Sequence, residues 1–437
     1  MTKHQLLFRF EQMVTIGALI LYSGGPLQVI LSGGASQGDD TGGIAEPDYG
    51  IIRLLCMLTY VVFSTLLIYR WKQAVYGIFK ARFVLALVFI ALLSYLWSDY
   101  PSITMNRGIA LFGTSLFGIY FGSRFTLKQQ LNLLGWSFGI IVFLSFAFAV
   151  ALPRYGIMGG VHAGTWRGIF THKNVAGRAM VLSSTVFLIL AAGAPKFRPL
   201  PWFLLLLSVF FVIMTRSFTA LTNLGLLISI FFALKIMRWR YDVRLLTLIT
   251  SFLLAGSAYI VVMLNLENIL AAFGKDLTLT GRSELWPLVI EMIERRPWFG
   301  YGYGGFWQGI NSAAGEVWRA YGWAAPHSHN GFLDLSLDLG LITLGLFLFE
   351  LFAILLLSVI RINRTQGNEY FLCVLFPLFI ALYSLTESTI MGRNTLFWVV
   401  FVAIAISTRI PIPIEQTTSE TLSKENDNLR NLQLQRD

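Results

Sequence analysis

The sequence predicts an all-α, polytopic membrane protein, and its composition and hydropathy pattern carry that prediction. Its 437 residues are 56% hydrophobic and only 13% charged, and the mean hydropathy is +0.66. Soluble domains contain about 25% charged residues. Apolar runs close to the roughly 20 residues that a helix needs to cross a bilayer recur along almost the whole chain. We therefore expect about 12 transmembrane helices.

The expected spans follow one another with mostly short polar connections. Gly24, Gly25 and Pro26 weaken the first span as a helix, and the third and fourth are short. Residues 1–411 are predicted to form a single transmembrane domain, and the polar composition of residues 412–437 predicts a disordered cytoplasmic tail. The approximate bounds of the spans are 13–31, 51–69, 83–97, 108–122, 132–152, 178–193, 199–214, 219–236, 245–264, 340–360, 369–386 and 394–410.

The distribution of Lys and Arg predicts that both termini are cytoplasmic. With an even number of spans the termini share one side, and that side carries more Lys and Arg once the longest loop is discounted. Residues 265–339 then form a large extracytoplasmic loop. Its many aromatic residues indicate that it is folded, and the apolar spacing of residues 283–295 predicts a helix. A loop of this length in a compact protein is usually functional.

The connections on the outward side favour arginine over lysine. They contain 11 Arg and 2 Lys, and a guanidinium binds phosphate or carboxylate with two parallel hydrogen bonds, which an ammonium cannot do. Because several connections bring these side chains to one membrane surface, the pattern predicts a site for an anionic ligand. The candidate residues for a diphosphate or a sugar are Arg107, Arg216, Arg282 and Arg393, together with Arg167, His172 and Lys173 of "GTWRGIFTHKN".

Histidine supplies the candidate acid or base. His329 lies between the large loop and the next membrane helix, in "HSHN". Its neighbours His327 and Asn330 are candidates for binding the diphosphate or the sugar. A neutral imidazole can accept the proton of an attacking hydroxyl, an effect worth roughly 10² to 10⁴ in rate. Two histidines could also ligate a metal. No third His or Cys lies near them in the sequence, so we expect no metal.

Other features argue against several classes of function. "GYGYGG" at residues 300–305 matches a dinucleotide fingerprint in letters only, because no strand precedes it, and it predicts a tight turn near the ligand instead. Hydrolase, protease and ATPase motifs are lacking, and no nucleic-acid partner is expected. A transporter should show mid-membrane charges and related halves, which the expected spans do not. Glu387 and Arg393, at the last outward turn, are expected to pair or to contact sugar.

A cationic cluster for a diphosphate and one base form the minimum set for moving a sugar from a lipid diphosphate to a hydroxyl. The sequence around these residues also resembles that of the O-antigen ligase and Wzy-type polymerase superfamily. In that pattern a His followed by Asn, Ser or Gln leads after nine residues to Gly-x-x-Thr, here His329, Asn330, Gly340 and Thr343. The stretches that carry the likeness are 97–108, 215–225, 281–306 and 326–349, with "RGIFTHKNVAGR" at 167–178 most similar to the exopolysaccharide polymerase branch.

The resemblance implies a GT-C-like, metal-independent and inverting glycosyltransferase of the bacterial inner membrane that needs no cofactor. Its donor would be an undecaprenyl diphosphate-linked oligosaccharide, used on the outer side of the bilayer, and its acceptor a glycan. Arg216 and Arg282 match the arginines that bind the donor diphosphate in the family, and His329 matches the histidine that activates the acceptor hydroxyl. A flippase and a chain-length regulator are candidate partners.

Two reactions of this class stay open. A polymerase joins a growing lipid-linked chain to another lipid-linked repeat unit, whereas a ligase moves a finished polymer onto lipid A-core or a protein. Both use the same donor and could use every residue named above. They differ in the acceptor, which the sequence does not reveal, and the likeness at residues 167–178 favours the polymerase.

Overall fold

The computed structural model describes residues 2–34, 50–193, 199–238, 282–365 and 367–411, together with Val243 and Thr247. The expected span at 245–264, apart from Thr247, and the tail at 412–437 lie outside the described residues. The elements of the described ranges are helices: α1 (Lys3–Leu21), α2 (Leu27–Leu31), α3 (Gly50–Tyr69), α4 (Trp71–Lys80), α5 (Arg82–Leu93), η1 (Ser94–Leu96), α6 (Pro101–Arg124), α7 (Leu127–Ala151), α8 (Pro153–Gly156), η2 (Gly160–His162), α9 (Lys173–Ala192), α10 (Pro199–Met214), α11 (Phe218–Ile236), α14 (Arg282–Arg295), α15 (Ala314–Tyr321), α16 (Gly331–Arg364), α17 (Tyr370–Ser384) and α18 (Leu396–Ser407).

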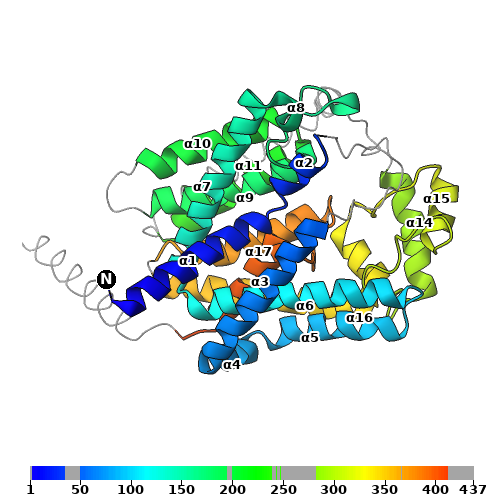
Figure 1. Ribbon diagram of the computed structural model, residues 1–437, viewed down its shortest axis with the longest axis horizontal. Coiled ribbons are helices and arrows are strands. Elements are labelled where there is room, and N and C mark those ends of the chain that lie inside the picture. The colour runs from blue at the N-terminus through cyan, green and yellow to red at the C-terminus, as the bar shows by residue number, and fades with distance from the viewer. Residues whose placement is uncertain are drawn as a thin grey trace, which may run out of the picture.

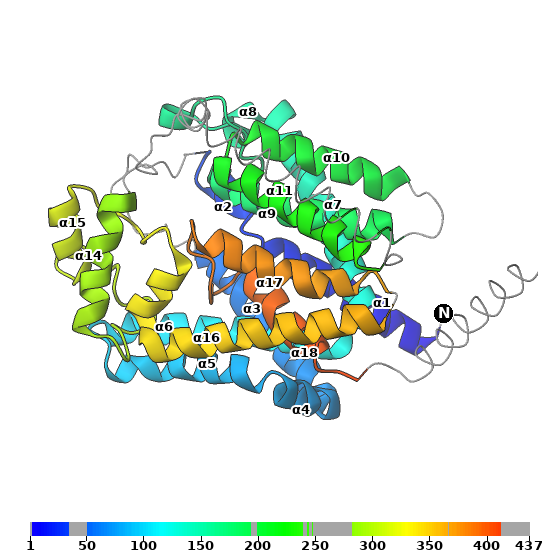
Figure 2. The same ribbon diagram turned by 180° about the vertical axis from the view of Figure 1, so that it is seen from behind.

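The long helices lie side by side in a layered bundle. Helices α7, α9, α10 and α11 run along one side and α5, α6 and α16 along the opposite side, with α1 and α17 between them (Figures 1 and 2). Helices α14 and α15 gather at one end of the bundle, away from the start of α1. The helix pairs in most extensive contact are α6 with α18, α9 with α10 and α16 with α17.

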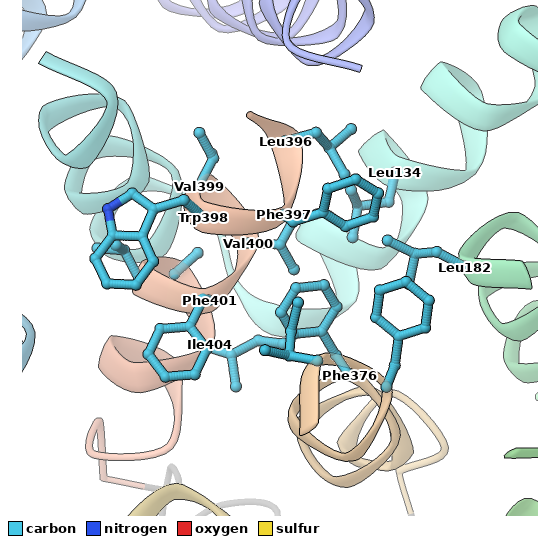
Figure 3. Packing of buried hydrophobic residues seen from close by; sticks show 14 of the residues in the cluster. Leu134, Leu182, Phe376, Leu396, Phe397, Trp398, Val399, Val400, Phe401 and Ile404 are labelled. Atoms are coloured by element: carbon cyan, nitrogen blue, oxygen red, sulfur yellow. The ribbon is translucent and has the colours of Figure 1, made fainter. Parts of the chain in front are cut away.

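Helix α18 occupies the core of the bundle. All 12 of its residues are buried, as expected for a helix that is apolar on every side. Figure 3 shows its side chains beside Leu134 of α7, Leu182 of α9 and Phe376 of α17. Two glycines of α6 permit the close approach, because a Cβ on Gly118 would lie 2.6 Å from the Cβ of Val402 and one on Gly122 would meet the backbone of α18.

Five of the described helices are long and apolar enough to cross a membrane, namely α3, α7, α9, α11 and α16. Helices α4 and α5 are bent by 85° relative to each other and make a sixth if taken as one span. Helices α10, α17 and α18 are apolar but shorter. The chain is thus a multi-pass membrane protein, whereas the total of twelve spans and the GT-C-like arrangement stay predictions.

Several expected spans have bounds that differ from those of the helices observed, and the first and the fourth are examples. The first, at 13–31, is interrupted, because α1 ends at Leu21 and α2 begins only at Leu27. Between them Gly24 has a φ of +91° and Pro26 follows, so the helix cannot continue. The fourth, at 108–122, is part of α6, which begins earlier at Pro101.

The described part of the large loop folds into a small helical lobe. The helix predicted at 283–295 is confirmed as α14, and α15 packs against it. Leu285, Val289 and Met292 of α14 form a buried cluster with Phe306 and Val317. The lobe is therefore held by its own apolar core and also packs on α16.

The loop meets the bundle at a break in α16. Gly340 has φ +75° and ψ 177° inside this helix. The N–H groups of Tyr301 and Gly302 donate to the carbonyls of Leu337 and Asp338, and the N–H of Leu341 donates to the carbonyl of Pro297. The glycine-rich turn therefore satisfies backbone groups of the helix. It contacts α16 closely, and the expected position near a ligand stays a prediction.

Candidate active site

The site is built around the segment that leads into α16. Asn330 is the N-cap of that helix, and its Oδ1 atom accepts from the N–H groups of Phe332 and Leu333 at 3.0 and 3.3 Å. His329 precedes it in a left-handed conformation, with φ +55°. The N–H of His329 donates to Nδ1 of His327 at 3.1 Å. The two imidazole rings are 4.1 Å apart between centroids.

Asp334, on the first turns of α16, fixes the segments on either side of the site. Its Oδ1 atom accepts from the N–H of Ser328 and from the indole N–H of Trp307, both at 3.0 Å. Its Oδ2 atom accepts from the hydroxyl of Ser388. One carboxylate therefore anchors the histidine segment, the large loop and the connection between α17 and α18.

That last connection places Glu387 at the centre of the site. Its Oε1 atom lies 3.6 Å from a guanidinium nitrogen of Arg282, the first residue of α14. Its Oε2 atom lies 3.9 Å from Nδ1 of His329. Its Oε1 atom also accepts from the amide of Asn174 in α9 at 3.2 Å. The side chains of Arg282, Glu387 and His329 are 13%, 15% and 20% exposed, so the group is sheltered but reachable.

The charges of these groups are set by their neighbours. Burial would by itself raise the pKa of Glu387, but contact with His329 and the charges of His327 and Arg282 outweigh it and lower the pKa to about 2. Burial, helped by His329 and Arg282, also lowers the pKa of His327 to about 4 against the opposing carboxylates. At neutral pH the site therefore holds an ionised Glu387 and an uncharged His327.

His327, His329 and Glu387 could also hold a metal ion. One ligand atom from each lies within 4.8 Å of the others, and two histidines with one glutamate are a donor set that zinc uses. The guanidinium of Arg282, 3.6 Å from the same carboxylate, opposes a divalent cation there. The arrangement fits an ion pair beside a proton acceptor better, and the expected absence of a metal stays a prediction.

The turn that carries Arg216 is linked to the site by a hydrogen bond of the next residue, Ser217. Arg216 is exposed, lies between α10 and α11, and has a φ of +48°. Ser217, the N-cap of α11, donates from its hydroxyl to Oδ1 of Asn174 at 3.1 Å. Since the amide of Asn174 contacts Glu387, the backbone of Arg216 is tied to the carboxylate that also faces Arg282 and His329.

Arg107 and Arg393 belong to a second group. A guanidinium nitrogen of Arg107 donates to the carbonyl of Gly304, in the glycine-rich turn, at 2.6 Å. Arg107 and Arg393 both act electrostatically on Asp338, one helical turn after Asp334 in α16. Glu387 faces Arg282 and His329, and its expected pairing with Arg393 or contact with sugar stays a prediction.

The polar segment at residues 164–174 divides between structural and site positions. Arg167 is fully buried, and its guanidinium donates to the carbonyls of Gly34, Arg154, Tyr155 and Thr171. These bonds give Arg167 a structural role, which differs from the expected contact with substrate. His172 is the N-cap of α9, with its Nδ1 accepting from the N–H of Asn174, and Lys173 begins the helix.

Unusual backbone conformations gather at these predicted positions. Among the described residues other than glycine, Arg216, His329, Met391 and Asn394 have positive φ, between 48° and 55°. Two of them are predicted catalytic residues, and the other two flank Arg393. Such conformations cost about 1–3 kcal/mol each and cluster at functional sites. Two of these four positions, Arg216 and His329, are therefore ones that the residue chemistry had also selected.

Asn174 and Asp334 were given no role from the sequence. Glu387 was expected to pair with Arg393 or to contact sugar, and its contacts with Arg282 and His329 were not predicted. No local sequence pattern indicated these contacts. Contacts between segments that are distant in the sequence decide which cation an acidic residue faces. These contacts cannot be predicted from the order of the residues.

Known proteins resemble this chain over the part that carries several of these residues. Residues 203–348 match the O-antigen ligase family, and that range includes Arg216, Arg282 and His329. Over that range this chain is similar to the O-antigen ligase family. It is also 24% identical over 303 residues to the exopolysaccharide production protein ExoQ of Rhizobium meliloti (strain 1021), an alignment that covers 65% of this chain and 67% of the relative. The chain is thus a membrane relative of O-antigen ligases near an exopolysaccharide branch.

Proposed function

We propose that this O-antigen ligase relative is a glycosyltransferase that polymerises undecaprenyl diphosphate-linked oligosaccharide repeat units on the outer side of the inner membrane. The product would be an exopolysaccharide or an O-antigen chain. The observation that carries the proposal is the meeting of Arg282, Glu387 and His329 in a sheltered but reachable position. A cation suited to a diphosphate and a base suited to a hydroxyl lie on two sides of one carboxylate.

In the proposed reaction the acceptor hydroxyl oxygen attacks the anomeric carbon of the donor sugar. Its proton passes to His329 as the new carbon–oxygen bond forms. The bond between the anomeric carbon and the diphosphate oxygen breaks, and its electron pair leaves with undecaprenyl diphosphate. Attack from the face opposite the leaving group inverts the anomeric configuration. The donor already contains an activated bond, so the reaction requires no nucleotide.

Glu387 supports the assignment of His329 as the base. The carboxylate faces Nδ1 of the imidazole at 3.9 Å, which leaves Nε2 for the hydroxyl. Because Glu387 stays ionised at neutral pH, it would stabilise the imidazolium that forms after proton transfer. The distance exceeds that of a hydrogen bond, and such contacts often tighten only when substrate is bound.

Arg216 and Arg282 are proposed to stabilise the charge on the leaving diphosphate. Arg282 lies at the start of α14, and Arg216 lies in the turn before α11. Removing one such donor typically costs about 10² to 10³ in rate. Arginines in this role supply the charge that a metal supplies in other phosphate chemistry, so we propose a metal-independent reaction.

A ligase reaction is the second candidate, and each candidate has one comparison in its favour. The family match is to O-antigen ligase, whereas the relative aligned over most of both chains is an exopolysaccharide production protein. For either reaction the bilayer supplies the lipid-linked donor. The proposed topology has cytoplasmic termini, with the site on the outer side, where a flippase would deliver the donor and a chain-length regulator could act.

The test is the product profile of a strain that lacks this chain. Loss of a polymerase should leave single repeat units on the carrier lipid, whereas loss of a ligase should leave full-length chains on it. Complementation with the wild-type chain should restore the product, and complementation with His329→Ala should not. Full activity of His329→Ala would show that the base is assigned incorrectly.

A further inference from the structure

Asn174 lies where three segments of the site meet, and neither the family resemblance nor the charge pattern gives it a role. It is the second residue of α9, and its N–H donates to Nδ1 of His172 at 3.1 Å. The local backbone contact leaves both ends of the side-chain amide for other partners. Those partners come from residues 43 and 213 positions further along the chain.

The nitrogen end of the amide orients Glu387. Nδ2 of Asn174 donates to Oε1 of Glu387 at 3.2 Å, and a guanidinium nitrogen of Arg282 lies 3.6 Å from the same oxygen. Both positive contacts are thus made to Oε1, while Oε2 faces Nδ1 of His329. Because the two oxygens have different partners, rotation of the carboxylate is restricted, and its second oxygen stays directed at the imidazole.

The oxygen end of the amide holds the turn that carries Arg216. Oδ1 of Asn174 accepts from the hydroxyl of Ser217 at 3.1 Å. Ser217 also caps α11, and Arg216 immediately before it has the left-handed backbone noted above. A single amide therefore spans the gap between the turn of one proposed diphosphate arginine and the carboxylate beside the other.

We propose that Asn174 is a positioning residue: it holds the Glu387 carboxylate against His329 and Arg282 and couples that group to the turn of Arg216. The inference rests on the proposed glycosyl transfer. A neutral amide suits the position, because it can donate to one partner and accept from the other without adding charge. The titratable and charged groups that face Glu387 are His327, His329, Arg282 from α14, Arg178 from α9 and Tyr383 from α17.

The test compares Asn174→Asp and Asn174→Ala in the purified full-length protein, with a lipid diphosphate-linked oligosaccharide as donor. Asn174→Asp keeps the acceptor for Ser217 but puts a second carboxylate beside Glu387. Acidic residues are favourable in the first turn of a helix, so the variant should fold. The added negative charge favours the imidazolium form of His329, so the acidic limb of the kcat profile should move to higher pH.

Asn174→Ala should lower kcat about tenfold, since it removes a hydrogen bond to a charged group.

Asn368→Ala is the matched control. Asn368 bridges Arg238 and the carbonyl of Ala192 and lies before the opposite end of α17 from Glu387. It should alter stability without altering the pH profile. An unchanged profile for Asn174→Asp, or equal losses for Asn174→Ala and Asn368→Ala, would overturn the positioning role. If Asn174→Asp does not fold, Ser217→Ala must reduce kcat more than Asn368→Ala for the inference to stand. Absence of glycosyl transfer by the wild type would instead refute the proposed function.

Discussion

The Nδ1 atom of His329 lies 3.9 Å from the Oε2 atom of Glu387, although 58 residues separate them in the sequence. The segments of chain next to each residue do not by themselves bring the two side chains together. His329 is placed by the left-handed turn before α16, and Glu387 by the connection between α17 and α18. The pair joins the proposed base to an ionised carboxylate in a site that is only partly exposed.

Replacing Glu387 with Gln should lower kcat by about 10²-fold, because the imidazolium that forms during proton transfer loses its counter-ion. The acidic limb of the kcat profile should move to lower pH for the same reason. Glu316→Gln, which removes an exposed carboxylate paired with Arg295 on α14, is the control and should keep the wild-type profile. A wild-type rate and profile for Glu387→Gln would remove this carboxylate from the mechanism.

Changing Arg282 or Arg216 to Lys should reduce kcat by about 10²-fold even though the charge is retained, because an ammonium cannot make two parallel hydrogen bonds to a diphosphate. Arg295→Lys is the matched control for Arg282, since it lies on the same helix α14 and is 47% exposed. Turnover of the purified variants provides the measurement. If both lysine variants turn over as fast as the wild type, bidentate binding is not required.

Arg167→Met should lower the free energy of unfolding by about 3 kcal/mol, because several backbone carbonyls lose their donor in a buried position. Arg154→Gln, at an exposed position of the same connection, should have little effect. Thermal unfolding in detergent micelles measures both. The folded fraction of Arg167→Met should keep the wild-type KM for the donor, and a raised KM would favour the substrate-binding role that the sequence predicted.

Gly340→Ala should destabilise the protein by about 3 kcal/mol. The residue has a φ of +75°, and a Cβ there would collide with the carbonyl of Trp298. Gly345→Ala in the same helix provides the contrast, because a Cβ at that position would meet nothing within 4 Å and alanine favours the helix. Equal unfolding midpoints for the two variants would show that the break in α16 does not depend on glycine.

His327 should make the fold less stable as the pH falls from about 6.5 to about 4. Burial, followed by His329, lowers its pKa in the folded protein to about 4, so the unfolded chain binds a proton first and protonation favours unfolding. The midpoint of thermal unfolding should therefore decrease across this window. The decrease should be smaller in His327→Gln and unchanged in His4→Gln, which alters an exposed histidine of α1. A wild-type slope for His327→Gln would contradict the shifted pKa.

The sequence alone predicted much of this protein because its signals are local. A long apolar run specifies a membrane helix wherever it stands, and the pattern at residues 283–295 specified α14. The chemistry of the polar connections and the family resemblance selected His329 and Arg282, and the fold brings both to the carboxylate of Glu387. The chemistry of those connections gave Arg167 a ligand role, because the sequence does not show whether a guanidinium donates to backbone carbonyls, as that of Arg167 does, or binds a phosphate.

The sequence by itself determined the class of the protein, the type of each helix and the residue chemistry available on its polar connections, since composition and hydropathy act over one or two helical turns. Only the tertiary structure decided which of those residues meet. Glu387 lies at the centre of the candidate site, Asn174 joins it to the turn of Arg216, and Arg107 and Arg393 lie where they act electrostatically on Asp338. These pairings follow from how distant helices pack, because burial of apolar faces fixes the ends of the helices and the polar groups there must then find partners.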